Sequence, residues 1–500
     1  MHIIHVTSEL NPIAKVGGLA DVVYGLSKQL IKNGHFVEII LPKYDTIDYS
    51  ALKKLKVEFR ELWSFEGPYQ FSNTFWSAEL ENLKIILMEA HHPQNYFNRR
   101  TIYGCPDDND RFIYFARTAM EYLYKSGKKP DILHLHDWPT ALMAPLYKEM
   151  YVPLGLHLSG IVLTIHNLEH QGKCAPFNLT KAGLQGEDYL TESTMQDPHN
   201  EDNINLLKGG IVYADAVTTV SPTYEKEIKT EPSGCGLNKT LNKYASKITG
   251  ILNGIDEDFW NPATDPHLKK NYETHTPDMQ TVLNAKEKNR NSIKMHHGLT
   301  LENVPLVISI TRLVPQKGPE LILQGLLHTL EVGGQFILLG SAPDPDTYLH
   351  FTSIKNSHPK GHNLILCFDK DEALAHHLFA AADMIIIPSL FEPCGLTQMI
   401  ALRYGTVPIV RKTGGLADTI FDIDTSEHPV HERNGYTFDS PNTEGITKAL
   451  DRALTCFNED KKKWHTLMQQ GMRYDFSWAH ETQAYISIYE KITSGRLLSE

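Results

Sequence analysis

Short apolar runs rich in β-branched residues alternate with helical stretches along the whole chain. In the first half these runs are Ile3–Ser8, Phe36–Leu41, Leu83–Ala90, Ile132–His136, Ile161–His166 and Ala216–Val220. In the second half they are Leu306–Thr311, Gln335–Leu339, Leu364–Phe368, Met384–Pro388 and Val407–Val410. Runs that are apolar at nearly every position are typical of parallel strands covered on both faces. The pattern predicts an α/β protein with two doubly wound, Rossmann-like sheets.

The stretch between the first two runs predicts a helix. Val23, Leu26 and Leu30 fall on one helical face, and Asn33-Gly34 supplies a stop before the next strand. A strand, a helix and a strand in this order form a βαβ unit. Sheets of this kind bind ligands at the carboxyl ends of their strands, and with two domains we expect a site in the cleft between them.

The length of 500 residues predicts more than one hydrophobic core. Residues 262–304 are polar and show little apolar periodicity, so we place the linker just before them. The expected domains are residues 1–246 and residues 247–470, with a final segment of helices over residues 471–500.

Composition narrows the possible functions. The net charge of −12 and the lack of a basic stripe argue against a nucleic-acid partner. No apolar run approaches the ~20 residues that span a membrane, and the N-terminus reads as a strand rather than a signal peptide. Six scattered cysteines without a CxxC spacing indicate reduced thiols, so we expect a cytoplasmic protein.

One internal repeat joins the two halves. Residues 15–21 read KVGGLAD and residues 412–418 read KTGGLAD, each after a strand and before a helix. Gly-Gly could merely ease two strand-to-helix turns. Alternatively, both loops present backbone N–H groups at helix N-termini to phosphate or sugar oxygens, with Lys15 and Lys412 adding charge. The spacing fits neither an NAD fingerprint nor a P-loop.

Two cations follow the strand Leu306–Thr311. Arg312 and Lys317 stand in the segment TRLVPQKG, where they can grip one diphosphate from two sides. Fixed cations stabilise the negative charge that builds on a departing diphosphate. The alternative is a structural arginine and a solvated lysine.

A carboxylate follows the strand Met384–Pro388 in the segment PSLFEPCGLTQ. Glu392 can hold sugar hydroxyls, and the amides of Leu396 and Thr397 can meet a phosphate at the start of the next helix. Taken alone, Glu392 could also be a helix-capping acid.

Further polar residues end two strands of the first half. His166 and Asn167 follow one strand, and Asp137 follows another. A lone histidine at a strand end is commonly structural, but a position at the carboxyl edge of the sheet favours a role in binding or catalysis.

The same strand ends carry residues of types that can bind metals. His134 and His136 point to one face of their strand, but no third ligand stands at a sensible spacing, so we predict no metal. Asp344-Pro345-Asp346 looks like a metal-binding DxD, yet its proline-rich context favours a turn.

The motifs together resemble the bacterial glycogen synthase and plant starch synthase family. They are KVGGLAD, HLHDW, TIHNLEHQG, TVSPTYEKEI, ILNGID, TRLVPQKG, PSLFEPCGLTQ, RKTGGLADTI and DFSW, in the order of the family across nearly the whole chain. The resemblance implies the GT-B fold, with two Rossmann-like domains across a deep cleft and final helices that return to the first domain. It implies retaining glucosyl transfer from ADP-glucose to an α-1,4-glucan, without a metal or other cofactor.

The resemblance also implies roles for individual residues. The donor and its phosphates would meet Lys15, Gly17, Gly18, Asp21, Arg312, Lys317, Leu396 and Thr397. The donor or acceptor sugar would meet Asp137, Asn167, Asn253, Cys394, Gly395 and Tyr96. The backbone carbonyl of His166 would stabilise the developing oxocarbenium, and Glu392 would orient the donor glucose.

The chain departs from the family at two places. Pro139 stands where many members have histidine, and Asp369-Lys370-Asp371 lacks the aromatic residue that stacks on adenine in a bacterial relative. These departures leave acceptor handling and the choice between ADP-glucose and UDP-glucose open. The alternatives to the main hypothesis are another GT-B retaining glycosyltransferase and a non-catalytic glucan-binding relative.

Overall fold

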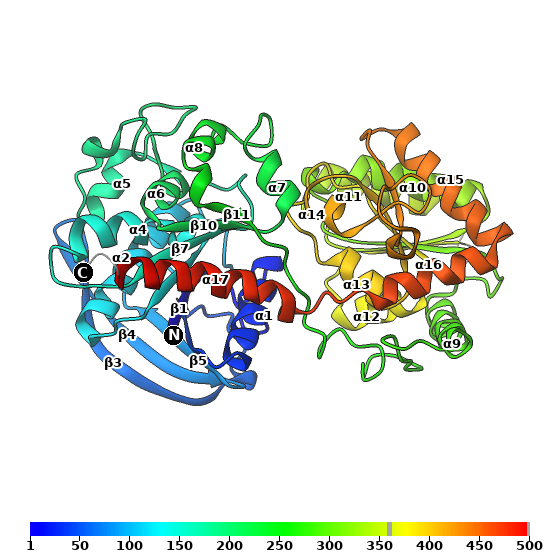
Figure 1. Ribbon diagram of the computed structural model, residues 1–500, viewed down its shortest axis with the longest axis horizontal. Helices are drawn as coiled ribbons and strands as arrows, with labels where there is room; N and C mark the ends of the chain where they lie inside the picture. Colours follow the sequence, from blue (N-terminus) through cyan, green and yellow to red (C-terminus); the bar gives the residue numbers. More distant parts are fainter. Residues whose placement is uncertain (358–362, 498–500) are drawn as a thin grey trace. The chain divides into compact units, whose positions relative to one another are not determined.

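The computed structural model describes residues 1–357 and 363–497. The chain forms two compact units (Figure 1). The first comprises Met1–Gly254 together with the chain from Trp478 on, and the second comprises Ile255–Ser477. Each unit is built on one large sheet, as the apolar runs predicted.

The sheet of the first unit has nine strands in the order β11-β10-β7-β6-β1-β2-β5-β4-β3. They are β1 (His2–Val6), β2 (Phe36–Pro42), β3 (Lys53–Glu66), β4 (Tyr69–Leu80), β5 (Leu83–Ala90), β6 (Ile132–His136), β7 (Gly160–Ile165), β10 (Ala216–Thr219) and β11 (Ile248–Gly250). The chain starts at β1 in the middle, runs outward to β2 and β5, and then crosses to β6 on the other side. The strand order reverses between β1 and β6, where open sheets of this class bind ligands.

The antiparallel hairpin of β3 and β4 was missed by the sequence pattern. Register shifts interrupt its pairing at three places, and Lys54 and Glu61 have positive φ angles. Such bulges break the alternation of period two, and most of β3 is exposed, so no continuous apolar run marks it. The short β8 (Lys173–Cys174) and β9 (Ile204–Asn205) form a separate two-stranded sheet and were also missed.

Helices of the first unit connect and cover these strands. They are α1 (Gly18–Lys32), α2 (Asp108–Ser126), α3 (Trp138–Ala141), α4 (Met143–Leu146), α5 (Pro176–Lys181), α6 (Leu206–Tyr213), α7 (Pro222–Glu227), α8 (Asn238–Lys243) and α17 (Trp478–Leu497). The predicted helix after β1 is confirmed as α1, which buries Val23, Leu26 and Leu30 and ends at Asn33.

The sheet of the second unit is entirely parallel, in the order β14-β13-β12-β15-β16-β17. Its strands are β12 (Leu306–Ile310), β13 (Gln335–Leu339), β14 (Leu364–Cys367), β15 (Met384–Ile387), β16 (Val407–Arg411) and β17 (Tyr436–Phe438). Its helices are α9 (Met279–His297), α10 (Pro319–Glu331), α11 (Pro345–Ser357), α12 (Glu372–Ala381), α13 (Thr397–Arg403), α14 (Gly414–Thr419), α15 (Thr443–Glu459) and α16 (Lys461–Arg473). The strand order reverses between β12 and β15, which repeats the logic of the first unit.

The unit boundaries differ from those expected at 246/247 and 470/471. β11 pairs with β10, so the chain stays in the first sheet as far as Gly254. An isolated β-bridge then pairs Ile255 with Ser477, the first and last residues of the second unit. The return of the final helix to the first unit is visible in α17, which lies beside α1 (Figure 1). None of the described helices is long and apolar enough to span a membrane.

Candidate active site

The first group of predicted residues lies at the carboxyl edge of the first sheet, where β6 and β7 end. Asp137 has φ 55° and ψ −173°, a backbone conformation that non-glycine residues rarely adopt. Its Oδ1 accepts hydrogen bonds from the backbone N–H groups of His166 at 2.6 Å and Asn167 at 3.4 Å. The strained Asp137 thereby joins two strand ends, and three of the predicted residues are brought together.

Burial shifts the pKa values of two groups at this edge of the sheet. It raises the pKa of Asp137 to about 7, although the hydrogen bonds from His166 and Asn167 act in the opposite direction. Burial also lowers the pKa of His166 to about 3, so its imidazole is neutral at physiological pH. Groups with such shifted pKa values are typical of functional sites.

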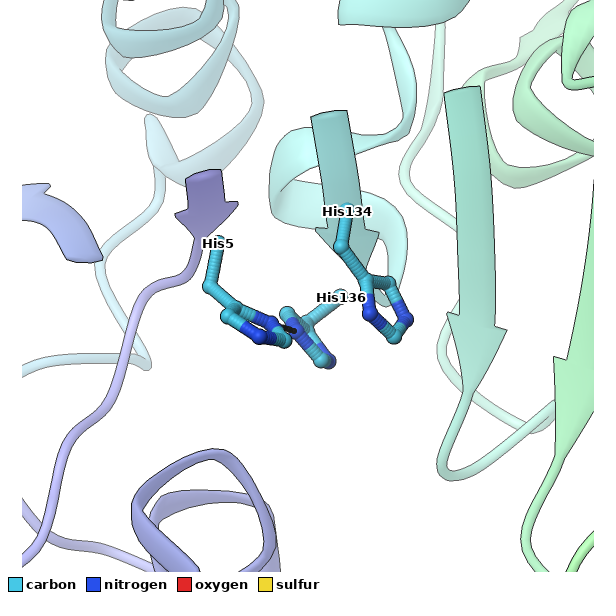
Figure 2. A group of neighbouring side chains, drawn as sticks. All are labelled: His5, His134 and His136. Carbon is cyan, nitrogen blue, oxygen red and sulfur yellow. Dashed lines mark hydrogen bonds between the residues drawn. The ribbon is translucent and has the colours of Figure 1, made fainter. Parts of the chain in front are cut away.

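A cluster of three further imidazoles contacts His166 through the ring of His136. The rings of His5, His134 and His136 gather beside β1 and β6 (Figure 2), with nitrogen atoms within 4.8 Å of one another. His5 is the third imidazole that sequence spacing did not reveal, so that argument against a metal was wrong. All of these nitrogens except His5 Nε2 are nevertheless paired: His5 Nδ1 with His136 at 2.9 Å, His136 also with His166 at 3.0 Å, and His134 with the hydroxyls of Tyr489 at 2.7 Å and Thr164 at 2.6 Å. A metal there would have to displace these hydrogen bonds.

The first Gly-Gly segment is held by a carboxylate that the sequence did not suggest. Glu9 Oε2 accepts hydrogen bonds from the backbone N–H groups of Val16 at 2.6 Å and Gly17 at 2.8 Å. These two amides are therefore already bound to an anion. The exposed Gly18 begins α1, and a Cβ at Gly17 would meet nothing within 4 Å. Lys15 makes an ion pair with Asp21, at 2.7 Å between Nζ and Oδ1.

Two other predicted residues of the first unit differ in their surroundings. Asn253 is buried, and its Oδ1 has no hydrogen-bond partner among the described residues. A buried polar atom without a partner is costly and marks a candidate ligand contact. Tyr96 is also buried, but its ring stacks on His92 and its hydroxyl donates to Glu66 at 2.6 Å. This position favours a structural role for Tyr96, and its contact with substrate stays a prediction.

The second group lies at the carboxyl ends of β12 and β15 in the second unit. Lys317 Nζ donates to Glu392 Oε2 at 2.5 Å, and Ser389 Oγ donates to the same oxygen at 2.7 Å. Glu392 is buried, whereas Arg312 is exposed and makes no ion pair with any described residue. The pair and the exposed guanidinium stand at the reversal of strand order, where a ligand is expected.

The second Gly-Gly segment has a different role from the one its sequence suggested. A Cβ at Gly414 would lie 2.0 Å from the Glu392 carbonyl oxygen, and one at Gly415 would lie 2.2 Å from that of Cys394. The Gly415 N–H also donates to the Glu392 carbonyl at 3.0 Å. These glycines therefore support the turn that carries Glu392, and the Gly415 amide is bound to backbone carbonyls of that turn instead of being offered to a ligand.

The turn after Glu392 leads into α13. Gly395 has φ +74°, and a Cβ there would lie 2.5 Å from the side-chain oxygen of Gln398. Cys394 is buried, while Leu396 and Thr397 at the start of α13 are partly accessible. The backbone geometry fits the predicted approach of a ligand to the first amides of α13, which no contact in the structure yet tests.

A cavity of about 540 Å³ lies at the carboxyl ends of β13 and β14. Its lining includes Ser341, Tyr348, Cys367, Phe368 and Asp369. The rings of Tyr348 and Phe368 lie 4.9 Å apart between centroids. Tyr348 comes from α11 and Phe368 directly follows β14, so aromatic groups reach this region although residues 369–371 are all charged. Sequence reasoning missed Tyr348 because no spacing links it to β14.

Two remaining sequence features are structural. Asp344 Oδ2 accepts from the backbone N–H of Thr347 at 2.8 Å at the start of α11, so the DxD segment begins a helix. Pro139 is buried in α3.

The two halves of the chain match two known families. Residues 2–243 match the starch synthase catalytic domain, and residues 293–466 match the glycosyl transferases group 1 family. A glycogen synthase of Protochlamydia amoebophila is 50% identical over 99% of this chain and 100% of its own length. A glycogen synthase 2 of Methylococcus capsulatus is 44% identical over 98% of this chain and 99% of its own.

A solved structure extends the likeness to three dimensions. The catalytic domain of starch synthase IV from Arabidopsis thaliana, bound to ADP and acarbose, superposes with a TM-score of 0.94 at 45% identity. The match covers 99% of both chains. The GT-B fold that the motifs implied is thereby confirmed.

Proposed function

This chain belongs to the glycogen synthase and starch synthase family of glycosyltransferases, and we propose that it lengthens glycogen. It transfers glucose from ADP-glucose to the non-reducing 4-hydroxyl of an α-1,4-glucan. The observation that carries the proposal is the pairing of Lys317 with Glu392 beside the exposed Arg312, at the reversal of strand order in the second unit. This arrangement offers cations for a diphosphate and a carboxylate for sugar hydroxyls.

The diphosphate of the donor binds to Arg312 and Lys317. Negative charge grows on the leaving diphosphate as its bond to glucose breaks, and preorganised cations stabilise that charge more than they stabilise the ground state. The first amides of α13, from Leu396 and Thr397, add N–H donors. Lys15 and the helix-terminal amide of Gly18 in the first unit stay predicted phosphate contacts.

The base of the donor binds in the cavity beside β13 and β14. Tyr348 and Phe368 supply aromatic faces on which a planar base can stack. A purine covers more of an aromatic ring than a pyrimidine does, which favours ADP-glucose over UDP-glucose. The structural relative bound to ADP supports the same preference.

Each unit carries polar groups that are predicted sugar contacts. Glu392, oriented by Ser389, accepts hydrogen bonds from sugar hydroxyls, and Asp137 and Asn167 supply further polar contacts. The backbone carbonyl of His166 stabilises positive charge at the anomeric carbon. These roles follow the family resemblance and agree with the burial and polarity of each group.

We propose a same-face mechanism for the transfer. The bond between the anomeric carbon and the diphosphate oxygen breaks, and a bond from the same face to the acceptor 4-oxygen forms. The acceptor hydroxyl gives its proton to the leaving diphosphate, so the stereochemistry is retained without a protein nucleophile. The variant Glu392→Ala supplied with azide separates the mechanisms, because an inverted glycosyl azide would indicate a covalent intermediate instead.

Radiolabelled ADP-glucose and glycogen test the function directly. We expect label to enter the polymer with purified protein, and an exo-acting amylase that cuts from non-reducing ends to release it. UDP-glucose in a parallel reaction should give a lower kcat/KM. Incorporation from neither donor, or label that resists the amylase, would overturn the proposal.

We further propose that the reaction needs no metal. Arg312 and Lys317 supply the positive charge that a metal ion gives a diphosphate in other transferases. Activity should therefore be unchanged after dialysis against EDTA, and a loss restored by Mg²⁺ would contradict the proposal. The six free cysteines fit a reducing compartment and support a cytoplasmic location.

A further inference from the structure

Three imidazoles form a continuous hydrogen-bonded chain that ends at the predicted site. His5 Nδ1 pairs with His136 Nε2 at 2.9 Å, and His136 Nδ1 pairs with His166 Nε2 at 3.0 Å. Figure 2 shows the first of these bonds, between side chains from β1 and β6. His5 and His136 are fully buried, while His166 keeps 9% of its surface exposed. The hydrogen-bonded row of three imidazoles thus runs from the interior of the sheet to its carboxyl edge.

A neutral imidazole carries one hydrogen, so each ring in such a chain donates through one nitrogen and accepts through the other. Burial lowers the pKa of His5 and His166 to about 3 and that of His136 well below its usual value, so all three rings are neutral. Only two arrangements then keep both hydrogen bonds. Either every ring donates towards His166, or every ring donates towards His5. The tautomers of the three rings are therefore linked.

The free end of the chain distinguishes the two arrangements. His5 Nε2 is buried and has no hydrogen-bond partner among the described residues. If the rings donate towards His5, this atom carries a buried N–H without an acceptor. If they donate towards His166, it is a bare acceptor. Buried N–H groups without partners are rarer in proteins than unsatisfied acceptors. Donation towards His166 is therefore favoured, and it places the hydrogen of His166 on Nδ1.

We propose that His5 and His136 are positioning residues that hold His166 as the Nδ1–H tautomer, so that it donates a hydrogen bond to a hydroxyl of the donor sugar. The Nδ1 atom of His166 has no partner among the described residues and belongs to the exposed end of the chain. This inference rests on the proposed function for the identity of the ligand. The tautomer itself follows from the hydrogen-bond contacts and the neutrality of the three rings, whatever the ligand is.

His134 supplies a matched control from the same layer. Its ring lies 4.4 Å from that of His136 and 4.8 Å from that of His5, between centroids. It is equally buried, but its nitrogens bond to Tyr489 and Thr164 and take no part in the chain. A change at His134 therefore disturbs the same core without touching the linkage to His166.

The direct test reads the tautomers by nitrogen-15 NMR on the full-length, histidine-labelled protein without substrate. The signals of His166 are identified by their loss in His166→Gln. We expect hydrogen on Nδ1 of His166 in the unchanged protein and in His134→Phe. His5→Phe removes the last ring of the chain, so both tautomers of His166 should appear. His5→Asn can still donate to His136 and should restore the single tautomer.

Turnover gives the second readout. His5→Phe should lower kcat about tenfold, the value of one lost hydrogen bond, with little change in KM for glycogen. His134→Phe should lower the thermal midpoint but not kcat, and His5→Asn should recover most of the activity. If His5→Phe does not fold, the spectrum of the unchanged protein still decides the tautomer.

Three results would overturn the inference: hydrogen on Nε2 of His166 in the unchanged protein, a single tautomer in folded His5→Phe, or mixed tautomers with an unchanged kcat. Failure of the proposed function looks different. A protein that transfers glucose from no donor, yet shows the Nδ1–H tautomer and its loss in His5→Phe, would contradict the glucosyl transfer and leave the linked tautomers standing.

Discussion

The two Gly-Gly segments share six of seven residues but have different structural roles. In residues 15–21, Gly17 faces open space, and its amide is held by the carboxylate of Glu9. In residues 412–418, both glycines lie against the backbone of the turn that carries Glu392. The first segment leaves space open beside Gly17, and the second packs under the turn that carries Glu392. Similar sequence at equivalent places therefore does not guarantee the same backbone or chemistry, since Gly17 has φ −141° and Gly414 has φ +44°.

The surroundings of the two segments differ in charge as well. The strand ends near the first segment carry a neutral histidine and an aspartate whose pKa is near 7. Those near the second carry the Lys317–Glu392 pair and the exposed Arg312. We infer that Arg312 and Lys317 of the second unit supply the fixed positive charge that stabilises the leaving diphosphate.

Removing the exposed guanidinium of Arg312 should lower turnover more than any other change considered below. Arg312→Ala should lower kcat by about 100- to 1,000-fold, or ~2.7–4 kcal/mol, because its charge matters most when the diphosphate departs. Steady-state rates with ADP-glucose check the value. The exposed Lys412 of the second segment is the control, since its segment is structural, and Lys412→Ala should stay within about twofold. Equal losses in both variants would contradict the contrast.

Adding one methyl group to each segment tests whether its glycine supports a buried turn or faces open space. Gly414→Ala places a Cβ 2.0 Å from the Glu392 carbonyl at φ +44°, so the turn must move. We expect kcat to fall about 100-fold, as for a ~1 Å misplacement of a catalytic group. Gly17→Ala meets nothing within 4 Å and should keep the native thermal midpoint. A Gly414→Ala enzyme with normal turnover would show that the turn does not position Glu392.

The raised pKa of Asp137 predicts a pH-dependent stability. Folding keeps this carboxyl protonated up to pH about 7, whereas an unfolded aspartate ionises near pH ~3.9. The folded state therefore loses stability as pH rises from about 4 to 7, and changes little above that. Asp137→Asn cannot ionise. Between pH 5.5 and pH 8, its free energy of unfolding should rise by about 1–2 kcal/mol relative to that of the original protein, allowing for partial solvent screening. Denaturant unfolding at both pH values measures this difference.

Replacing the carboxylate under the first segment should have the smallest effect. Glu9→Gln keeps one oxygen to accept from Val16 and Gly17 but loses the charge that strengthens both bonds. We expect KM for ADP-glucose to rise about fivefold, a loss of ~1 kcal/mol, with kcat little changed. Initial rates over a range of donor concentrations decide. A larger fall in kcat would mean that the loop also acts in the transition state.

Sequence patterns predicted the elements whose signal is local. Every buried parallel strand with an unbroken apolar run was found, and the strand-end rule brought Arg312, Lys317 and Glu392 to one edge of a sheet. Asp137 and His166 were joined in the same way. The hairpin of β3 and β4 was missed because bulges interrupt its alternation.

Contacts between distant segments could not be predicted. His5 and His136 are 131 positions apart, and no spacing rule connects them. Glu9 is close to Gly17 in sequence, but only the path of the intervening loop brings its carboxylate onto two amides. The packing of Gly414 on Glu392 likewise depends on how two neighbouring strands end. The residue types were visible, and their partners were not.

The position of α17 has a consequence for how the chain folds during synthesis. The indole of Trp478 occupies the space where a side chain at Gly25 would lie, and the Tyr489 hydroxyl bonds to His134 in the sheet. The first unit is thus incomplete until the last helix has left the ribosome, whereas Ile255–Ser477 is continuous and can close earlier. The half that is translated first is finished last, so shortening the C-terminus should expose apolar surface at the opposite end of the sequence.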